Sequence, residues 1–320
     1  MEKKIENREY LYRVLALVYN HARRVAVIEY PRDIERRSVD VAVELKDGKK
    51  MLLKVAWDLD SVTKREASEL SVISSTLNVP TLIISETQGS VRLVSGVIYE
   101  KSNVRVVNAE TLESYLSERE GPVIYQERDS FKLSIDGGKL KEKRIEKGLS
   151  LGDVALSVGV TRKAVYEYER GLMEPTIDKG EKLVQLLGED ILKPLNLLEL
   201  APRSQGQASP SRFDSDIERK AANLLEQEGY RVFHAKRTVS DIGGAKRESS
   251  LLLAVKHRKE SIEGLLEKSI YLERLSKVIG SEAATLVEDS GIARALSSEG
   301  ITVYTMEDIV SLVRSLERRE

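Results

Sequence analysis

The sequence predicts two α/β domains that flank an all-helical domain. Its 320 residues are more than one compact core usually needs, so several domains are expected. Strand-like apolar runs alternate with amphipathic helical patterns near both ends, whereas residues 139–188 contain helical patterns only. We therefore place an N-terminal α/β domain at residues 1–120 and a helical domain, opened by a hairpin, at residues 121–200. A linker at residues 201–212 leads to a C-terminal α/β domain at residues 213–320.

The N-terminal domain is predicted from alternating helices and strands. Residues 8–22 form an amphipathic helical pattern. Asp47 and Gly48 form a strong hairpin turn signal between two strand-like runs. Strands are expected at residues 25–30, 39–45, 51–57, 80–84 and 104–107, and further helices at 63–77 and 109–116. This succession is typical of a single α/β core.

The C-terminal domain repeats this succession after a linker. Residues 201–211 lack apolar periodicity and are rich in Ser, Gln, Gly and Pro, which is typical of a mobile connection. Residues 252–255 resemble residues 52–55, which indicates a domain duplication. The alternative is that any two small α/β domains look alike at this level. Helices are expected at residues 216–228, 262–279 and 306–316, and strands at 230–235, 251–255, 283–287 and 301–304.

The middle domain carries the strongest local signals. A helix over residues 139–147 is followed by Gly148, which suits a helix C-terminus. Ser150 and Asp153 have the spacing of a capping box, in which the hydroxyl accepts an N–H and the carboxylate reaches back. The helix that they open ends in a tight turn at Gly159, where a positive φ is easiest.

A second short helix follows that turn. Thr161 caps a helix over residues 162–170, and Val165 and Tyr168 lie on its inward face. Two helices joined by a glycine turn, with polar residues on the outer face of the second, form the geometry that enters a DNA major groove. That outer face consists of Arg162, Lys163, Tyr166 and Glu167.

Residues 159–171 and 174–176 resemble the lambda-repressor/Cro-type helix-turn-helix family. The resemblance rests on a Gly-Val-Thr-Arg series, a Glu-Arg-Gly terminator and a following proline. One departure is Gly152, where the family often has a glutamine that donates to a phosphate. The resemblance implies base contacts from Arg162, Lys163 and Glu167, and backbone contacts from Thr161 and Arg170.

The chemistry of these side chains agrees with such roles. Arg and Lys donate to guanine O6 and N7, and Glu accepts from cytosine N4. Basic residues of the preceding helix are expected to add sequence-independent phosphate contacts. The alternative is a plain helical bundle, in which Lys163 and Glu167 form only an i,i+4 pair. The candidate DNA-binding residues are Lys141, Arg144, Ser150, Thr161, Arg162, Lys163, Tyr166, Glu167 and Arg170.

The whole layout resembles the archaeal family of HTH-type transcriptional regulatory proteins. This resemblance implies a regulator that binds specific sites in double-stranded DNA, with an adaptor that binds protein as an alternative. A homodimer is expected, because one recognition helix covers too few base pairs for useful discrimination. Residues 262–279 are expected to supply the dimer surface. The alternative is a monomer in which the two outer domains pair within one chain.

The N-terminal domain also resembles the restriction-endonuclease-like fold of archaeal Holliday-junction resolvases. Those enzymes hold Mg²⁺ with an Asp on one hairpin strand and a Glu-x-Lys motif on the next. Asp40 stands at the first position, but residues 54–56 read Lys-Val-Ala and residues 254–256 read Ala-Val-Lys. Because each half lacks necessary groups, no catalytic residue is expected and two degenerate endonuclease-like domains are predicted. A residual nuclease and a small-molecule sensor remain alternatives.

Composition narrows the remaining classes. The formal net charge is −1, so any basic face must be local, and the chain has no cysteine for disulfides or thiolate zinc sites. The three histidines, His21, His234 and His257, are scattered and are expected to be isolated, with no metal and no cofactor. No long apolar run or signal region occurs, which predicts a cytoplasmic protein without a membrane partner.

Overall fold

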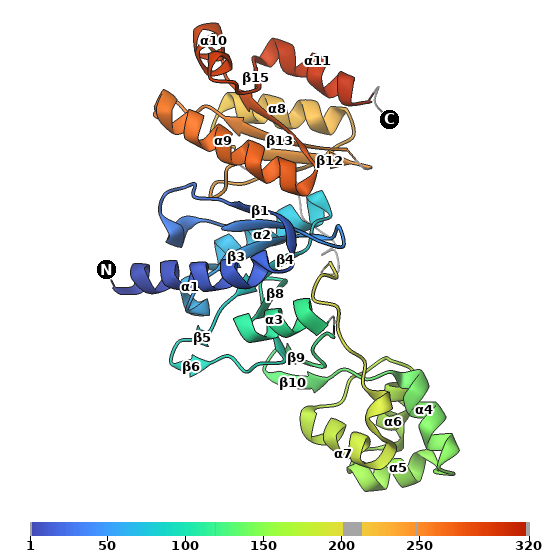
Figure 1. The fold of residues 1–320 in the computed structure, drawn as a ribbon. Coiled ribbons are helices and arrows are strands. Elements are labelled where there is room, and N and C mark those ends of the chain that lie inside the picture. Colours follow the sequence, from blue (N-terminus) through green and yellow to red (C-terminus); the bar gives the residue numbers. More distant parts are fainter. Residues whose placement is uncertain (1, 119, 201–212, 248, 318–320) are drawn as a thin grey trace. The chain divides into compact units, whose positions relative to one another are not determined.

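The computed structural model describes residues 2–118, 120–200, 213–247 and 249–317 (Figure 1). The predicted linker at residues 201–212 lies outside these residues. Within the described ranges, no helix is both long and apolar enough to span a bilayer. The chain divides into two compact units, which we describe separately. The first comprises Met1–Ile84, Ser102–Val104 and Leu198–Glu320, and the second comprises Ser85–Lys101 and Arg105–Leu197.

The N-terminal half of the first unit is a twisted sheet with helices. Its strands lie in the order β1-β2-β3-β4, with antiparallel β1/β2 and β2/β3 pairs and a parallel β3/β4 pair. Every residue of β2 and β4 is buried, as the apolar runs predicted. The strands are Ala22–Val27, Val41–Leu45, Lys50–Val55 and Thr81–Ile84; the helices are α1 (Glu2–Tyr19), η1 (Ile34–Arg36), η2 (Leu59–Ser61) and α2 (Lys64–Leu77).

The C-terminal half of the first unit has the same order and sense of strands. Its sheet runs β11-β12-β13-β14-β15, with two antiparallel pairs followed by two parallel pairs. The strands are β11 (Arg231–His234), β12 (Ile242–Lys246), β13 (Ser249–Val255), β14 (Glu282–Leu286) and β15 (Val303–Tyr304). The helices are α8 (Asp216–Gln227), α9 (Ile262–Ile279), α10 (Ser290–Ser298) and α11 (Met306–Glu317).

One aspartate in each half makes the same hydrogen bonds. Asp40 and Asp241 each donate their backbone N–H to the carbonyl of a leucine in the following strand, at 2.9 Å in both halves. The Oδ2 atom of Asp40 accepts the N–H of Val55 at 2.8 Å, and that of Asp241 accepts the N–H of Val255 at 2.6 Å. The sheet register around the two aspartates is therefore the same.

Strand β12 was not predicted, because it contains Gly243 and Gly244, which have little strand propensity. The structure shows why glycine stands there: a Cβ atom at Gly243 would overlap the ring of Phe233. The aromatic ring of the neighbouring strand thus fills the place of a side chain. Helix α10 was also missed.

Helix α9 packs on both halves of the first unit. It covers β13 and β14 of its own sheet and also contacts β1 and β2 (Figure 1). Lys50 donates to the carbonyl of Ile279 at 2.8 Å, and Arg32 pairs with Glu267 at 2.9 Å. One face of this helix is therefore used within the chain, where the two halves pair, while Ile262 and Ile270 remain exposed on α9, so its role as a dimer surface stays a prediction. The homodimer itself stays a prediction.

The second unit joins a small sheet to a helical bundle. Strands β8 (Val104–Val107), β7 (Val97–Lys101), β9 (Ile124–Glu127) and β10 (Ser130–Leu133) lie in this order. The expected hairpin is the antiparallel β9/β10 pair. The unit also contains β5 (Thr87–Gln88), β6 (Val91–Arg92) and α3 (Ala109–Glu118), and the bundle contains α4 (Gly137–Glu146), α5 (Leu151–Val158), α6 (Arg162–Glu169), α7 (Ile177–Leu187) and η3 (Glu189–Ile191).

The bundle has a core of its own. Leu140 of α4, Val154 of α5, Val165 of α6 and Leu183 of α7 are all fully buried in one cluster. Leu133 of the hairpin belongs to the same cluster. The four helices therefore hold one another in a fixed arrangement, which is what a recognition helix requires.

Candidate nucleic-acid interface and nuclease-like centres

The N-terminus of α5 is fixed by a capping box. The Ser150 hydroxyl accepts the N–H of Asp153 at 3.2 Å, and the Asp153 carboxylate accepts the N–H of Ser150 at 2.8 Å. Hydrogen bonds from Ser150 hold the pKa of Asp153 below its ordinary value. The helix ends at Gly159, whose φ is +75°. The predicted capping box and turn are therefore confirmed.

Helix α6 presents its outer face to solvent. The hydroxyl of Thr161 accepts the N–H of Ala164 at 3.1 Å and so caps the helix. Arg162, Lys163 and Tyr166 are exposed. Inward, Val165 and Tyr168 pack in the bundle core. The division into an outer polar and an inner apolar face agrees with the prediction.

Lys163 and Glu167 form the i,i+4 ion pair that the sequence allowed, with Nζ and Oε1 3.7 Å apart. The Lys163 side chain is 83% exposed. Exposed pairs of this kind contribute only about 0.3–0.5 kcal/mol. This pair is therefore weak and leaves both side chains able to change partners.

Arg170 and Tyr166 form a second exposed pair on the same helix. The guanidinium carbon lies 5.5 Å from the centre of the Tyr166 ring, and Nη1 donates to the hydroxyl at 3.4 Å. The stacking orients a cation at the C-terminal end of α6.

Arg144 is not on the solvent-facing side of α4, where a contact with DNA phosphates would require it to be. Its Nε is 2.5 Å from Glu169 Oε1, its Nη1 donates to the carbonyl of Leu149 at 2.9 Å, and only 12% of its side chain is exposed. This arginine joins α4 to α6 inside the bundle, so we remove it from the candidate interface. Lys141 on the same helix is exposed and stays a candidate.

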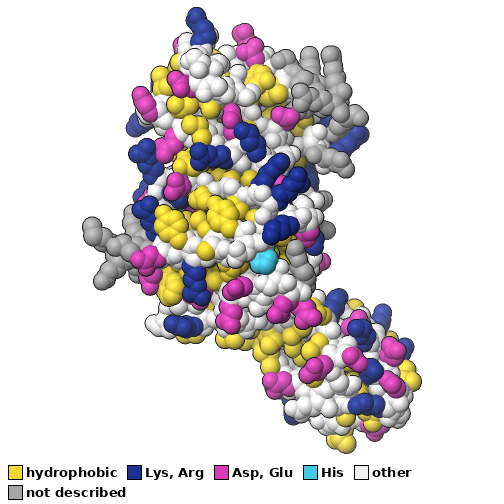
Figure 2. Space-filling model, viewed as in Figure 1, with side chains coloured by type: hydrophobic (Ala, Val, Ile, Leu, Met, Phe, Trp, Pro, Cys, Tyr) yellow, Lys and Arg dark blue, Asp and Glu magenta, His cyan; other side chains and the backbone are white. Residues whose placement is uncertain are grey.

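The surface of the bundle is mixed in charge. On the face drawn in Figure 2, Lys and Arg side chains alternate with Asp and Glu over the small helical lobe. Part of this basic charge is already paired, because Lys143 lies 3.2 Å from Glu146 and 3.3 Å from Asp190. On this face the bundle therefore presents no broad basic field.

The N-terminal nuclease-like centre contains an ammonium group where a second carboxylate is needed. Lys54 Nζ lies 3.2 Å from Asp40 Oδ2, and both side chains are almost fully buried. Burial raises the pKa of Asp40, and the Lys54 charge offsets part of that rise. Asn7 on α1 accepts the N–H of Trp57 at 2.8 Å. A magnesium ion does not fit this set of groups. It would have to displace the buried ammonium group of Lys54, and Asp40 alone would offer it a carboxylate, whereas Mg²⁺ needs several oxygen ligands.

The C-terminal centre has a richer set of groups. Asp241 lies 2.5 Å from Lys268 Nζ and 3.2 Å from His257 Nε2. Burial raises the pKa of Asp241, but Lys268 and His257 outweigh burial, so that its pKa lies below the ordinary value. The hydrogen bond to Asp241 in turn raises the pKa of His257. Glu218 on α8 lies 3.6 Å from His257 Nε2.

The expectation of isolated histidines is wrong for two of the three. His234 and His257 both lie within 3.6 Å of Glu218. The sequence did not bring them together, because the strand that does so was not predicted: β12 runs antiparallel to both β11 and β13 and so places their C-terminal ends beside Asp241. Glu218 was missed because the residues around it in the sequence do not show that α8 packs beside the strand ends that carry the two histidines.

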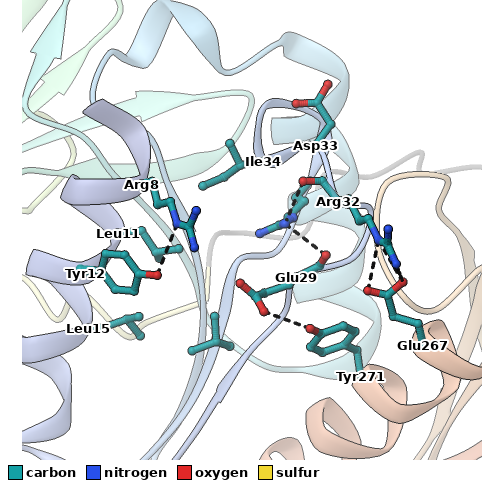
Figure 3. Close-up of a pocket in the computed structure, with 12 residues that line it drawn as sticks. Arg8, Leu11, Tyr12, Leu15, Glu29, Arg32, Asp33, Ile34, Glu267 and Tyr271 are labelled. Carbon is teal, nitrogen blue, oxygen red and sulfur yellow. Dashed lines mark hydrogen bonds and ion pairs between the residues drawn. The ribbon is translucent and has the colours of Figure 1, made fainter. Parts of the chain in front are cut away.

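A hollow of about 700 Å³ also lies in the first unit, between α1, the segment around η1, and α9 (Figure 3). Its polar lining groups are paired with one another. Arg32 Nη2 donates to Glu267 at 2.9 Å, and the Tyr271 hydroxyl donates to Glu29 at 3.0 Å. The chemistry of this lining therefore indicates no particular ligand, and the small-molecule sensor gains no support from it.

Comparison with known proteins agrees with the two kinds of site. Residues 7–122 match the PD-(D/E)XK superfamily domain, and residues 140–193 match the helix-turn-helix domain. A protein of Aeropyrum pernix, named "Putative HTH-type transcriptional regulatory protein", is 38% identical over 297 residues, covering 89% of each chain. No solved structure matches.

More distant relatives carry the same description. One from Methanocaldococcus jannaschii is 27% identical over 284 residues, covering 88% of this chain and 87% of its own. One from Saccharolobus islandicus is 28% identical over 324 residues, covering 99% of this chain and 98% of its own. The fold and sites define a helix-turn-helix protein with a PD-(D/E)XK domain. The chain belongs to the archaeal family of HTH-type transcriptional regulatory proteins.

Proposed function

We propose that this protein binds specific sites in double-stranded DNA with the helix pair α5–α6 and regulates transcription from them. The observation that carries the proposal is the capped pair itself. Ser150 and Thr161 fix the two helix starts, Gly159 turns the chain between them, and the first turn of α6 presents Arg162 and Lys163 to solvent. A major groove admits a helix that is held and exposed in this way.

The proposed contacts divide into two groups. Arg162, Lys163 and Glu167 face base edges, where the cations donate to guanine and the carboxylate accepts from cytosine. The remaining candidates contact the sugar-phosphate backbone and carry no sequence information. They are Lys141, Ser150, Thr161, Tyr166 and Arg170.

The flanking parts act as non-catalytic scaffolds in this proposal. The shared strand order and the shared hydrogen bonds of Asp40 and Asp241 support two copies of one endonuclease-like fold. In the N-terminal copy, Lys54 occupies the place of a metal-binding carboxylate. Two chains bind one two-fold operator, which doubles the sequence that is read.

Selection of bound fragments from a random duplex pool, with the full chain, tests the proposal. A short two-fold sequence motif is expected to become enriched, and its affinity is expected to fall steeply as salt rises. The same selection with Arg162→Ala should yield a weaker or altered motif. If the full chain enriches no sequence, or if both proteins enrich the same motif equally, the base-reading role of α6 is refuted.

A further inference from the structure

Two histidines and two buried carboxylates converge in the C-terminal half of the first unit. His257 Nε2 lies 3.2 Å from Asp241 Oδ1 and 3.6 Å from Glu218 Oε1. His234 Nε2 lies 3.5 Å from the other oxygen of Glu218. The donor atoms of Glu218, Asp241 and His257 all lie within 4.8 Å of one another. The proposed DNA-binding function uses none of them.

Glu218 leaves one buried oxygen without a hydrogen-bond partner. Its side chain is 0% exposed, and its Oε2 accepts the N–H groups of Asp214 and Ser215 at 2.6 and 3.0 Å. Its Oε1, which is directed at His257, has no hydrogen-bond partner. His234 Nε2 likewise has none, although only 4% of that side chain is exposed. Unsatisfied buried polar atoms are costly, so the unpaired Glu218 Oε1 indicates a missing ligand, whereas His234 Nε2 lies beside the other oxygen of Glu218 and is not counted as a donor.

We propose that Glu218 Oε1, Asp241 Oδ1 and His257 Nε2 bind a divalent transition-metal cation. Two donors that each lie about 2.1 Å from a cation are separated by roughly 3.0–3.4 Å at octahedral or tetrahedral angles. The separations of 3.2 and 3.6 Å are already close to this range. The groups need only small movements to enclose an ion.

The surroundings prepare each ligand for this role. Asp241 Oδ2 is held by Lys268 and by the N–H of Val255, which leaves Oδ1 free to face His257. Lys268 is itself fixed by the carbonyl of Val255 at 3.3 Å. Fixed partners of this kind orient metal ligands. The His257 side chain is 33% exposed, so an ion has a way in from solvent.

The donor set decides the class of metal. One imidazole nitrogen with two carboxylates suits Zn²⁺, Mn²⁺, Co²⁺ or Fe²⁺, whereas Mg²⁺ and Ca²⁺ prefer oxygen donors alone. Glu218, Asp241 and Lys268 together carry one net negative charge when His257 is neutral, and the nearby Glu260 adds a further one, which favours a dication. The N-terminal half has a different donor set: Asp40 also leaves its Oδ1 without a hydrogen-bond partner, but its Oδ2 faces Lys54, Asn7 on α1 accepts the N–H of Trp57, and no histidine or second carboxylate among the described residues completes a metal-binding group there.

Cobalt binding to the full chain tests the site. Protein stripped with a chelator and titrated with Co²⁺ is expected to take up one ion per chain, with a visible absorption band and a higher melting temperature. His257→Ala is expected to weaken binding at least about ten-fold and to abolish the band. His21→Ala is the matched control, because this third histidine lies outside the cluster and should leave the titration unchanged.

Glu218→Gln alone would be ambiguous, because Glu218 also completes the capping box of α8. His257→Ala removes no helix cap, but it does remove the 3.2 Å hydrogen bond to Asp241, so circular dichroism and melting of the metal-free variants verify their folding. The proposal is overturned if the full chain takes up no stoichiometric Co²⁺, Mn²⁺ or Zn²⁺. It is also overturned if His257→Ala binds as tightly as His21→Ala. DNA selection with the metal-free protein tests the DNA-binding proposal independently of the metal titration. The DNA-binding proposal and the metal-site proposal can therefore each fail without the other.

Discussion

The guanidinium group of Arg162 lies over Gly152, the second residue of α5. A Cβ atom at position 152 would lie 2.8 Å from Nε and 2.9 Å from Nη2 of Arg162. The arginine thus fills the space that a longer side chain at position 152 would occupy. Its charge lies near Asp153 in the first turn of α5 and contributes to lowering the pKa of that carboxyl. The glycine at position 152 and the side-chain position of Arg162 are therefore coupled.

Gly152→Ala is expected to separate stability from DNA binding. Alanine in a helix is favoured over glycine by about 0.5–1 kcal/mol, so the free energy of unfolding should rise. The new methyl group must push the Arg162 side chain aside, so affinity for the selected site should fall while affinity for random DNA changes little. Thermal melting and fluorescence anisotropy measure the two effects. In an Arg162→Ala background the loss of affinity should vanish, and an equal loss there would contradict the pairing.

Arg162→Ala and Lys141→Ala are expected to differ in kind. The first should cost roughly 1–3 kcal/mol on the preferred site and relax specificity there. The second should weaken binding to every duplex about equally and reduce the salt dependence by about one phosphate contact. Titrations of both variants on selected and random duplexes distinguish these outcomes. An equal loss on both duplexes for Arg162→Ala would show that it reads no base.

Arg144→Ala is expected to act on stability. It leaves the Glu169 carboxylate, whose side chain is 5% exposed, without its ion-pair partner. Breaking a buried pair in this way costs about 3 kcal/mol. Chemical denaturation of the full chain measures the loss in the transition of the helical bundle. Lys139→Ala, at an exposed position of the same helix, should change stability by less than about 0.5 kcal/mol. Similar effects of both changes would be inconsistent with the structural role of Arg144.

The capping box of α5 is expected to give the bundle an acid-sensitive component. Ser150 holds the pKa of Asp153 below its ordinary value of 3.8, so the contribution is present above 3.8 and is lost as the pH falls through the lower, folded-state pKa. Asp153→Ala should therefore lower the melting temperature near neutral pH and have a shrinking effect below 3.8. A difference from the unchanged chain that persists at the lowest pH would argue against this origin.

No Mg²⁺-dependent cleavage is expected from the N-terminal centre. Lys54 already pairs with Asp40, and among the residues that the structure describes no second carboxylate joins Asp40 in a possible metal-binding group. Plasmid and branched DNA incubated with the purified chain and Mg²⁺ should remain intact. Cleavage that copurifies with the chain and disappears in Asp40→Ala would reverse this conclusion. Asp33→Ala is a control, since that carboxylate is only partly buried and pairs with Arg36.

The helix-turn-helix was readable from the sequence because its signals are local. Ser150 and Asp153 meet across one helical turn, and Gly159 needs a positive φ only for itself. Long helices followed from apolar periodicity, and α9 begins and ends at the predicted residues. Strand β12 was not readable, because its glycines make sense only against the Phe233 ring of the neighbouring strand.

The sequence by itself determined the helix caps, the turn and the polar outer face of α6, since these depend on residues within one or two turns of each other. Only the tertiary structure decided which charges remain available. It paired Arg144 with Glu169 across 25 positions of the chain, and it brought His257 to Glu218 from a different strand end. Charge interactions depend on distance in space and on burial, and neither is written in the spacing of residues along the chain.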